Sequence, residues 1–105
     1  EITVNQDEDL VPEPRAFCTL CCTNGKLYMF GGWDGSCALG DLWVIDDVEL
    51  SEWREVKCIE EDISPSPRMN HAAAMGPDGR MFVFGGSNYV YHDDLWIFDC
   101  ILGEW

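Results

Sequence analysis

An internal repeat constrains the fold of this chain more than any other feature of its sequence. Three short motifs each occur twice in the same order: Pro-Arg at residues 14–15 and 67–68, Gly-Gly at 31–32 and 85–86, and Asp-Leu-Trp at 41–43 and 94–96. The two copies lie 53 or 54 residues apart. A unit repeated at such a spacing is one supersecondary element, and it buries its apolar faces by stacking on its neighbours.

The pattern within each copy predicts β-strands. The apolar runs at residues 16–23 and 69–75 are each followed by a tight-turn signal, Asn24-Gly25 in one copy and Pro77-Asp78-Gly79 in the other, which predicts a hairpin. Further strands are expected at residues 26–30, 41–46 and 53–58 of the first copy, and at 80–84 and 94–99 of the second. No segment has a helical period, so each complete copy predicts four short antiparallel strands.

The order of these motifs resembles the kelch repeat, including His71 where many kelch repeats have histidine, although the first copy has Cys18 there. The resemblance implies an all-β fold of four-stranded antiparallel blades in a β-propeller, with about two blades present. Residues 14–58 would form one repeat and 67–105 a second repeat that is truncated at its fourth strand. Residues 1–13 would hold the end of a preceding blade and an acidic loop, and 59–66 an acidic loop between blades.

Propellers close with roughly four to eight blades, so we expect this chain to be a fragment of a larger protein. The remaining blades would come from the parent chain or from self-association. Several recurring residues are then predicted to be structural. The glycines would allow close backbone approach, the tryptophans would fill the space between blades, and the arginines would form ion pairs or stack. These residues are Gly31, Gly32, Gly85, Gly86, Trp43, Trp53, Trp96, Trp105, Arg15 and Arg68.

Charge and composition exclude several classes of function. Twenty acidic and six basic residues give a net charge of −14, which repels phosphate backbones and anionic lipid, so neither a nucleic acid nor a membrane is an expected partner. The N-terminal residues lack the basic start and apolar centre of a signal peptide. We therefore expect a cytoplasmic protein, with the nucleus as an alternative, and six free cysteine thiols.

No motif indicates catalysis, a metal or a cofactor. Cys18 and Cys21 have a C-x-x-C spacing, but residues three apart in a strand point to opposite faces and cannot share one ion. His71 and His92 have no evident nucleophile beside them in the sequence, and the paired aspartates lie outside any calcium-loop pattern. We expect no enzyme activity. The alternative is a kelch-type propeller enzyme whose site lies on missing blades.

The resemblance implies instead a protein-interaction module, used as a scaffold or as a substrate receptor. Loops after the second strands, together with the segments after Pro-Arg, would lie on one face. The protein-binding candidates there are Trp33, Asp34, Ser87, Asn88, Tyr89, Tyr91, Phe17 and Asn70. The acidic runs at residues 7–9 and 60–62 are expected to lie beside exposed aromatic side chains, which favours a basic segment of the protein partner.

Overall fold

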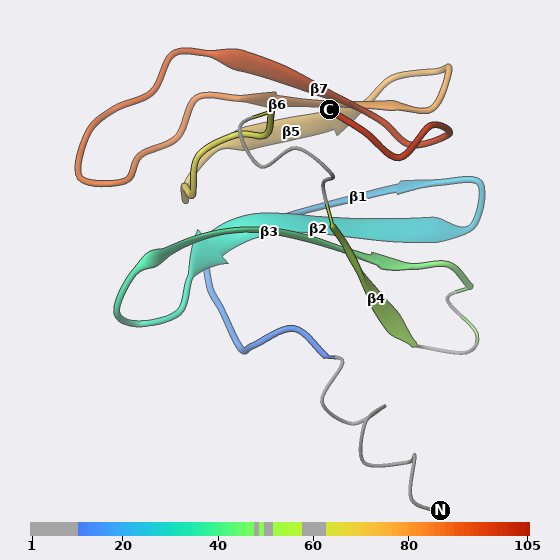
Figure 1. Cartoon of the computed structure of the whole chain (residues 1–105), viewed down its shortest axis with the longest axis horizontal. Helices are drawn as coiled ribbons and strands as arrows, with labels where there is room; N and C mark the ends of the chain where they lie inside the picture. Colours follow the sequence, from blue (N-terminus) through green and yellow to red (C-terminus); the bar gives the residue numbers. More distant parts are fainter. Residues whose placement is uncertain (1–10, 48, 50–51, 58–62) are drawn as a thin grey trace, which may run out of the picture.

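The computed structural model describes residues 11–47, 49, 52–57 and 63–105, which form two antiparallel sheets (Figure 1). The first sheet contains β1 (Thr19–Thr23), β2 (Lys26–Trp33), β3 (Ala38–Ile45) and β4 (Trp53–Val56), in that order. The second contains β5 (Ala72–Met75), β6 (Arg80–Phe84) and β7 (Leu95–Asp99), also in sequence order. This all-β arrangement confirms the predicted fold class. In the part of the chain described, no helix is long and apolar enough to cross a membrane.

The strand boundaries differ from the predicted ones at the motifs themselves. The first strands were expected to begin at residues 16 and 69, but β1 and β5 begin three residues later. Phe17 and Asn70, with φ of 61° and 58°, have left-handed backbone conformations that interrupt an extended strand. In the first sheet, β2 also continues through Gly31 and Gly32 to Trp33, with a register irregularity between Phe30 and Gly32.

The hydrophobic core lies between the two sheets. Side chains alternate across a strand, so Tyr28 and Phe30 of β2 point to the same face as Leu42 and Val44 of β3, with which they pair. This face packs against the second sheet, where the core residues are Met81, Val83 and Phe98. Because one sheet covers the other, the two repeats form their core jointly.

The four tryptophans that were predicted to be structural fall into two groups. Trp105 lies between the sheets, where its ring is 5.3 Å from that of Phe30 and 5.1 Å from that of Phe98, and Trp96 also packs against this core. Trp43 and Trp53 lie on the other face of the first sheet, because they alternate with the residues that face the core. Trp43 is buried and Trp53 is half-buried. Of these four, Trp96 and Trp105 therefore pack at the contact between the two sheets.

The outer face of the second sheet is apolar and exposed. Phe82, Phe84, Leu95 and Ile97 alternate with the core residues of β6 and β7, and so they point away from the first sheet. Phe84 is 53% exposed and Leu95 is 58% exposed. Their counterparts one repeat earlier, Phe30 and Leu42, are buried in the core between the sheets. The second sheet therefore covers this face of the first sheet, whereas the equivalent face of the second sheet is exposed among the described residues.

Candidate functional site

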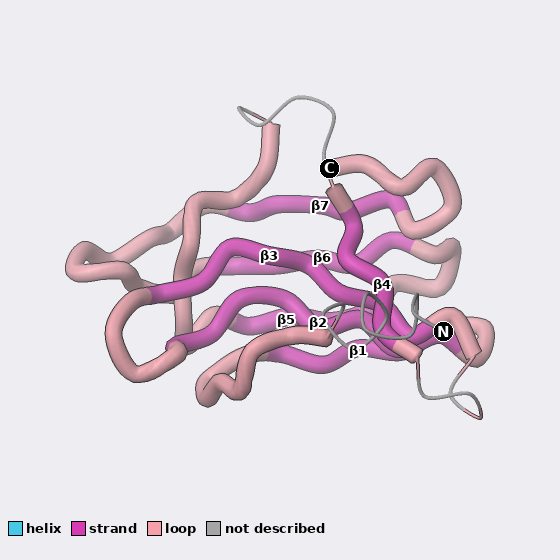
Figure 2. The backbone as a smooth tube through the Cα atoms, turned by 60° about the horizontal axis from the view of Figure 1, so that its bottom comes forward, coloured by secondary structure: helices cyan, strands magenta, loops and turns pink. Residues whose placement is uncertain are grey.

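The longer connections of both sheets gather at one end of the strands (Figure 2). This end, called the loop end here, comprises residues 15–18, 33–38, 68–70 and 85–94. Backbone bridges join Ala16 to Trp33 and Met69 to Ser87, so the segment after each Pro-Arg lies beside the segment after each Gly-Gly. Tight turns lie at the opposite end of the strands (Figure 1). The fold thus brings four of the predicted binding segments together in space.

An arginine clamp holds the loop end of each sheet in place. Arg68 donates to both carboxylate oxygens of Asp94, at 2.6 and 3.0 Å, and also to the carbonyl oxygens of Gly85 and Ser66. Arg15 makes the same set of bonds one repeat earlier, to Asp41 and to the carbonyl oxygens of Gly31 and Glu13. The bidentate geometry suits the planar guanidinium group.

Each clamp includes the tryptophan two residues after its aspartate. The Trp96 indole N–H donates to Asp94 at 2.8 Å, and the Trp43 indole N–H donates to Asp41 at 2.7 Å. The hydrogen bonds from Arg68 hold the pKa of Asp94 well below its usual range. Burial raises the pKa of Asp41, but the hydrogen bonds from Arg15 and Trp43 outweigh burial, and the net shift is downward. Both carboxylates are therefore ionised partners of a structural pair.

Three backbone hydrogen bonds dock the second repeat onto the first. Gly32 N–H donates to the Arg68 carbonyl oxygen at 2.9 Å, Arg68 N–H donates to the Leu39 carbonyl oxygen at 3.0 Å, and Asn70 N–H donates to the Phe17 carbonyl oxygen at 3.2 Å. The glycines are required for this approach. A Cβ on Gly31, which has φ of 70°, would lie 2.7 Å from the Arg68 carbonyl oxygen. The double glycine thus serves the contact between repeats.

His71 completes this contact from the second repeat. Its Nε2 atom is 2.8 Å from the Thr19 hydroxyl, and its ring meets the Phe30 ring edge-on with centroids 5.1 Å apart. The side chain is buried between the sheets. Burial lowers the pKa of His71, and the nearby Arg68 charge lowers it further. His71 is therefore a packing residue of the interface in this geometry.

We expect the stability of the chain to fall as pH decreases below the ordinary histidine pKa of 6.5. The unfolded chain protonates His71 more readily than the folded chain does, so acid favours unfolding in the window below that value. Urea unfolding between pH 7.5 and 5.5 measures the effect. His71→Gln keeps a hydrogen-bonding side chain but cannot titrate, and it should flatten the dependence, whereas His92→Gln is the matched control. An unchanged slope in His71→Gln would contradict this assignment.

The most exposed aromatic side chains of the loop end are tyrosines. Tyr89 is 85% exposed and Tyr91 is 94% exposed. Residues 34–38, in the equivalent loop of the first sheet, include no aromatic residue. Phe17 is also exposed. Tyr89 and Phe17 have positive φ, at 65° and 61°, as does Asn70 at 58°. A positive φ is unusual for phenylalanine and tyrosine, and strained backbone of this kind is found at ligand clamps and other functional sites.

The remaining predicted binding residues are less available. Trp33 is half-buried at the end of β2, and Ser87 and Asn88 are half-buried in the loop between β6 and β7. The Asp34 carboxylate accepts hydrogen bonds from the backbone N–H groups of Ser36 and Cys37, at 2.8 and 2.9 Å. Bonds from Cys37 and then Ser36 lower the pKa of Asp34. This carboxylate therefore stabilises its own turn.

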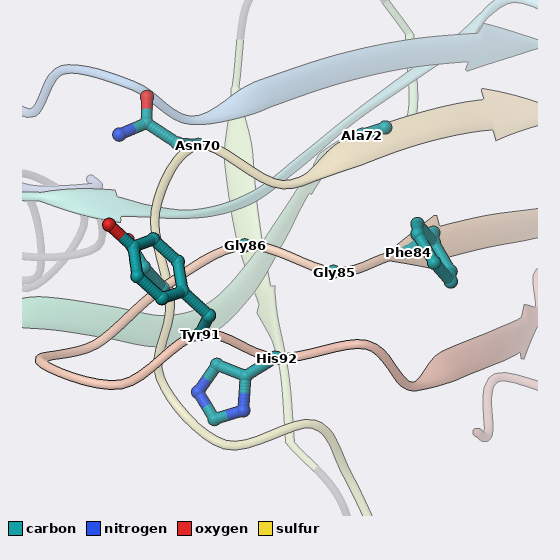
Figure 3. A pocket seen from close by; sticks show the side chains of 8 residues that line it. Asn70, Ala72, Phe84, Gly85, Gly86, Tyr91 and His92 are labelled. Carbon is teal, nitrogen blue, oxygen red and sulfur yellow. The ribbon is translucent and has the colours of Figure 1, made fainter.

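A pocket of about 400 Å³ opens beside the loop end of the second sheet (Figure 3). Its walls combine aromatic rings, backbone and short polar side chains: Asn70, Ala72, Phe84, Gly85, Gly86, Ser87, Tyr91 and His92. Sequence reasoning identified Asn70, Ser87 and Tyr91, but it missed Ala72, Phe84 and His92. These three residues correspond, one repeat earlier, to Thr19, Phe30 and Leu39. The repeat itself was therefore a signal that could have identified them.

Three other predictions concern a metal site, the cysteine thiols and the acidic runs. The described residues contain no group of three side chains suited to holding a metal ion. Cys18, Cys21, Cys22, Cys37 and Cys100 are free thiols, and Cys58 lies outside the described residues. The acidic runs at residues 7–9 and 60–62 also lie outside them, so their predicted position beside the aromatic side chains remains a prediction.

Comparisons with known proteins agree with the repeat geometry. The KLHDC2/KLHL20/DRC7 Kelch-repeats domain matches residues 2–105. The chain is 33% identical over 103 residues to Rho GTPase-activating protein gacHH of Dictyostelium discoideum, covering 90% of this chain and 6% of that protein. Two Arabidopsis thaliana proteins are also similar. F-box/kelch-repeat protein At1g51550 is 32% identical over 98 residues, covering 85% of this chain and 20% of that protein. Acyl-CoA-binding domain-containing protein 4 is 36% identical over 96 residues, covering 90% and 14%. The chain therefore spans a fifth or less of these relatives.

Proposed function

This chain belongs to the kelch-repeat family, and we propose that its loop end is a docking surface for another protein, without catalytic activity of its own. The family match confirms the resemblance found in the sequence. Kelch repeats are generally protein-interaction modules. The observation that carries the proposal is the pair of tyrosines, Tyr89 and Tyr91, which are almost fully exposed on a loop held by the Arg68 clamp.

Exposed tyrosines on a constrained loop are suited to binding. Tyrosine buries a large area on binding and has few rotatable bonds to immobilise, which makes it a frequent hot-spot residue. The loop is tied back on itself, since Asn88 N–H donates to Val90 and His92 N–H donates to Gly86. Phe17 adds a third exposed ring from the neighbouring repeat. A partner would thus meet a preorganised surface.

We propose a basic segment as the chemistry of the partner. The loop end carries two arginines, Arg15 and Arg68, and both are engaged in ion pairs with aspartate. Asp34 and Asp93 are exposed at the same end, and the whole chain has a net charge of −14. A cationic segment would be attracted by this charge, and its lysine or arginine side chains could stack on the tyrosine rings.

Selection of random twelve-residue peptides on the immobilised chain tests this function. We expect enrichment of peptides with lysine or arginine, and we expect Tyr89→Ala with Tyr91→Ala to weaken their binding by about 1 to 3 kcal/mol. Raising the salt concentration should weaken it further, because exposed charges are screened. Leu102→Ala, at an exposed position in the turn after β7, is the matched control. Equal binding by the tyrosine variant and the control would refute the docking surface.

A further inference from the structure

An exposed serine, Ser66, lies beside the arginine clamp of the second sheet. It belongs to the connection from β4 to β5, so both sheets that flank it are part of the described structure. Its hydroxyl oxygen accepts a hydrogen bond from Arg68 Nη2 at 3.2 Å, and its carbonyl oxygen accepts one from Arg68 Nε at 3.1 Å. The Arg68 side chain itself is buried. An accessible hydroxyl group thus lies next to a fixed positive charge.

Two prolines constrain the backbone on either side of Ser66. Pro65 and Pro67 have a restricted φ, and a residue that precedes a proline favours an extended conformation. Pro67 is also held against the first sheet, since a Cβ on Gly40 of β3 would lie 3.1 Å from its ring. Protein kinases bind their substrates as extended segments, and one class of kinases requires a proline directly after the serine. Ser66 therefore has the local structure of such a substrate.

The equivalent position one repeat earlier is already acidic. Residues 12–15 correspond to residues 65–68, which places Glu13 at the position of Ser66. Arg15 Nε donates to the Glu13 carbonyl oxygen at 3.0 Å, as Arg68 Nε does to Ser66. Arg15 also keeps its hydrogen bonds to both carboxylate oxygens of Asp41. The clamp is therefore compatible with a negative charge at this position.

We propose that Ser66 is phosphorylated by a kinase that acts on serine before proline, and that the phosphate strengthens docking of a cationic segment at the loop end. The second part rests on the function proposed above. In the reaction, Ser66 Oγ bonds to the γ-phosphorus of ATP, the bond from that phosphorus to the bridging oxygen breaks, ADP leaves, and the hydroxyl proton passes to a base of the kinase. The product carries a charge of about −2 near pH 7 and three acceptor oxygens.

Arg68 can bind this phosphate without releasing Asp94. Its Nη2 atom has two hydrogens, and it donates to Asp94 at 3.0 Å and to the Ser66 hydroxyl at 3.2 Å. The second bond is at the long end of the usual range, so the hydroxyl can leave it at little cost when a kinase binds. A phosphate oxygen would then accept from the same N–H group in a charge-assisted bond. This bond would hold the added charge beside the loop end.

Phosphorylation of the whole chain with ATP and a kinase of this class tests the site. Ser64 is the other serine followed by proline, and no threonine is followed by one. We expect fragmentation mass spectrometry to locate the phosphate at Ser66, with incorporation retained in Ser64→Ala and lost in Ser66→Ala. No incorporation, or incorporation at Ser64 instead of Ser66, would overturn the proposed site.

Binding of an oligolysine peptide tests the effect on docking. We expect the phosphorylated chain to bind it about 2- to 10-fold more tightly at low salt, with a smaller difference at high salt. Ser66→Glu and Leu102→Glu each add one negative charge, but Leu102 lies in the exposed turn after β7, at the opposite end of the strands. Only Ser66→Glu should tighten binding appreciably. Equal binding by both forms of the chain would refute the effect of Ser66, whereas absence of binding by either form would contradict the docking surface itself.

Discussion

Replacing Arg68 with methionine is expected to lower the free energy of unfolding by about 2 to 4 kcal/mol, one of the two largest losses that we predict. The Arg68 side chain is 1% exposed and makes hydrogen bonds to Asp94, Gly85 and Ser66. Its removal leaves these groups without their donor. The Asp94 side chain is partly exposed to water, which places the expected loss below that of a fully buried pair.

Urea unfolding at one low protein concentration measures this loss. Arg54→Met is the matched control, because Arg54 also makes a bidentate pair, with Asp46, but both side chains are exposed. An exposed pair contributes about 0 to 1 kcal/mol. If Arg68→Met does not fold, Arg68→Lys keeps the charge without the planar fork and should show a smaller loss. Equal stability of the Arg68 and Arg54 variants would show that the clamp is not structural.

Gly31→Ala is the second substitution with a large expected effect, about 2 to 4 kcal/mol. The φ of 70° at Gly31 is unfavourable for alanine, and a Cβ there would lie 2.7 Å from the backbone oxygen of Arg68, which is held by the docking contact. Gly103→Ala separates the two causes. Gly103 has a similar φ of 75°, but nothing lies within 4 Å of the added Cβ.

The Gly103→Ala control should therefore lose about 1 to 2 kcal/mol, from backbone strain alone. Thermal or urea unfolding of both variants gives the comparison. The difference between them is the contribution of close approach between the repeats. If the two variants lose the same free energy, the Gly31 position does not depend on its neighbour, and the second repeat is not docked as described.

The repeat pattern was sufficient to predict the sheets and the family. Turn signals such as Asn24-Gly25 and alternating apolar residues are local, so strand order followed from the sequence. The recurrence of Pro-Arg also indicated a structural ion pair or stacking role, but its partner could not be chosen among many acidic residues. Asp41 and Asp94 each lie 26 residues after their arginine, and a contact at that separation depends on the fold.

Side-chain exposure was harder to predict. Trp33 was expected to be an exposed anchor, but the continuation of β2 through the two glycines leaves it half-buried. The positive φ of Asn70 agrees with the ordinary preference of asparagine, whereas those of Phe17 and Tyr89 do not follow from residue type. They arise because the segments after Pro-Arg and Gly-Gly must bend to meet each other at the loop end.

The central claim is that backbone hydrogen bonds dock the second repeat onto the first, with Gly32 N–H donating to the Arg68 carbonyl oxygen. Amide hydrogen exchange at Gly32 and Gly86 tests it most directly, since the two N–H groups occupy equivalent positions. We predict slow exchange at Gly32, and faster exchange at Gly86, whose N–H group has no acceptor among the described residues. Fast exchange at Gly32, or an equally slow Gly86 amide, would contradict the account.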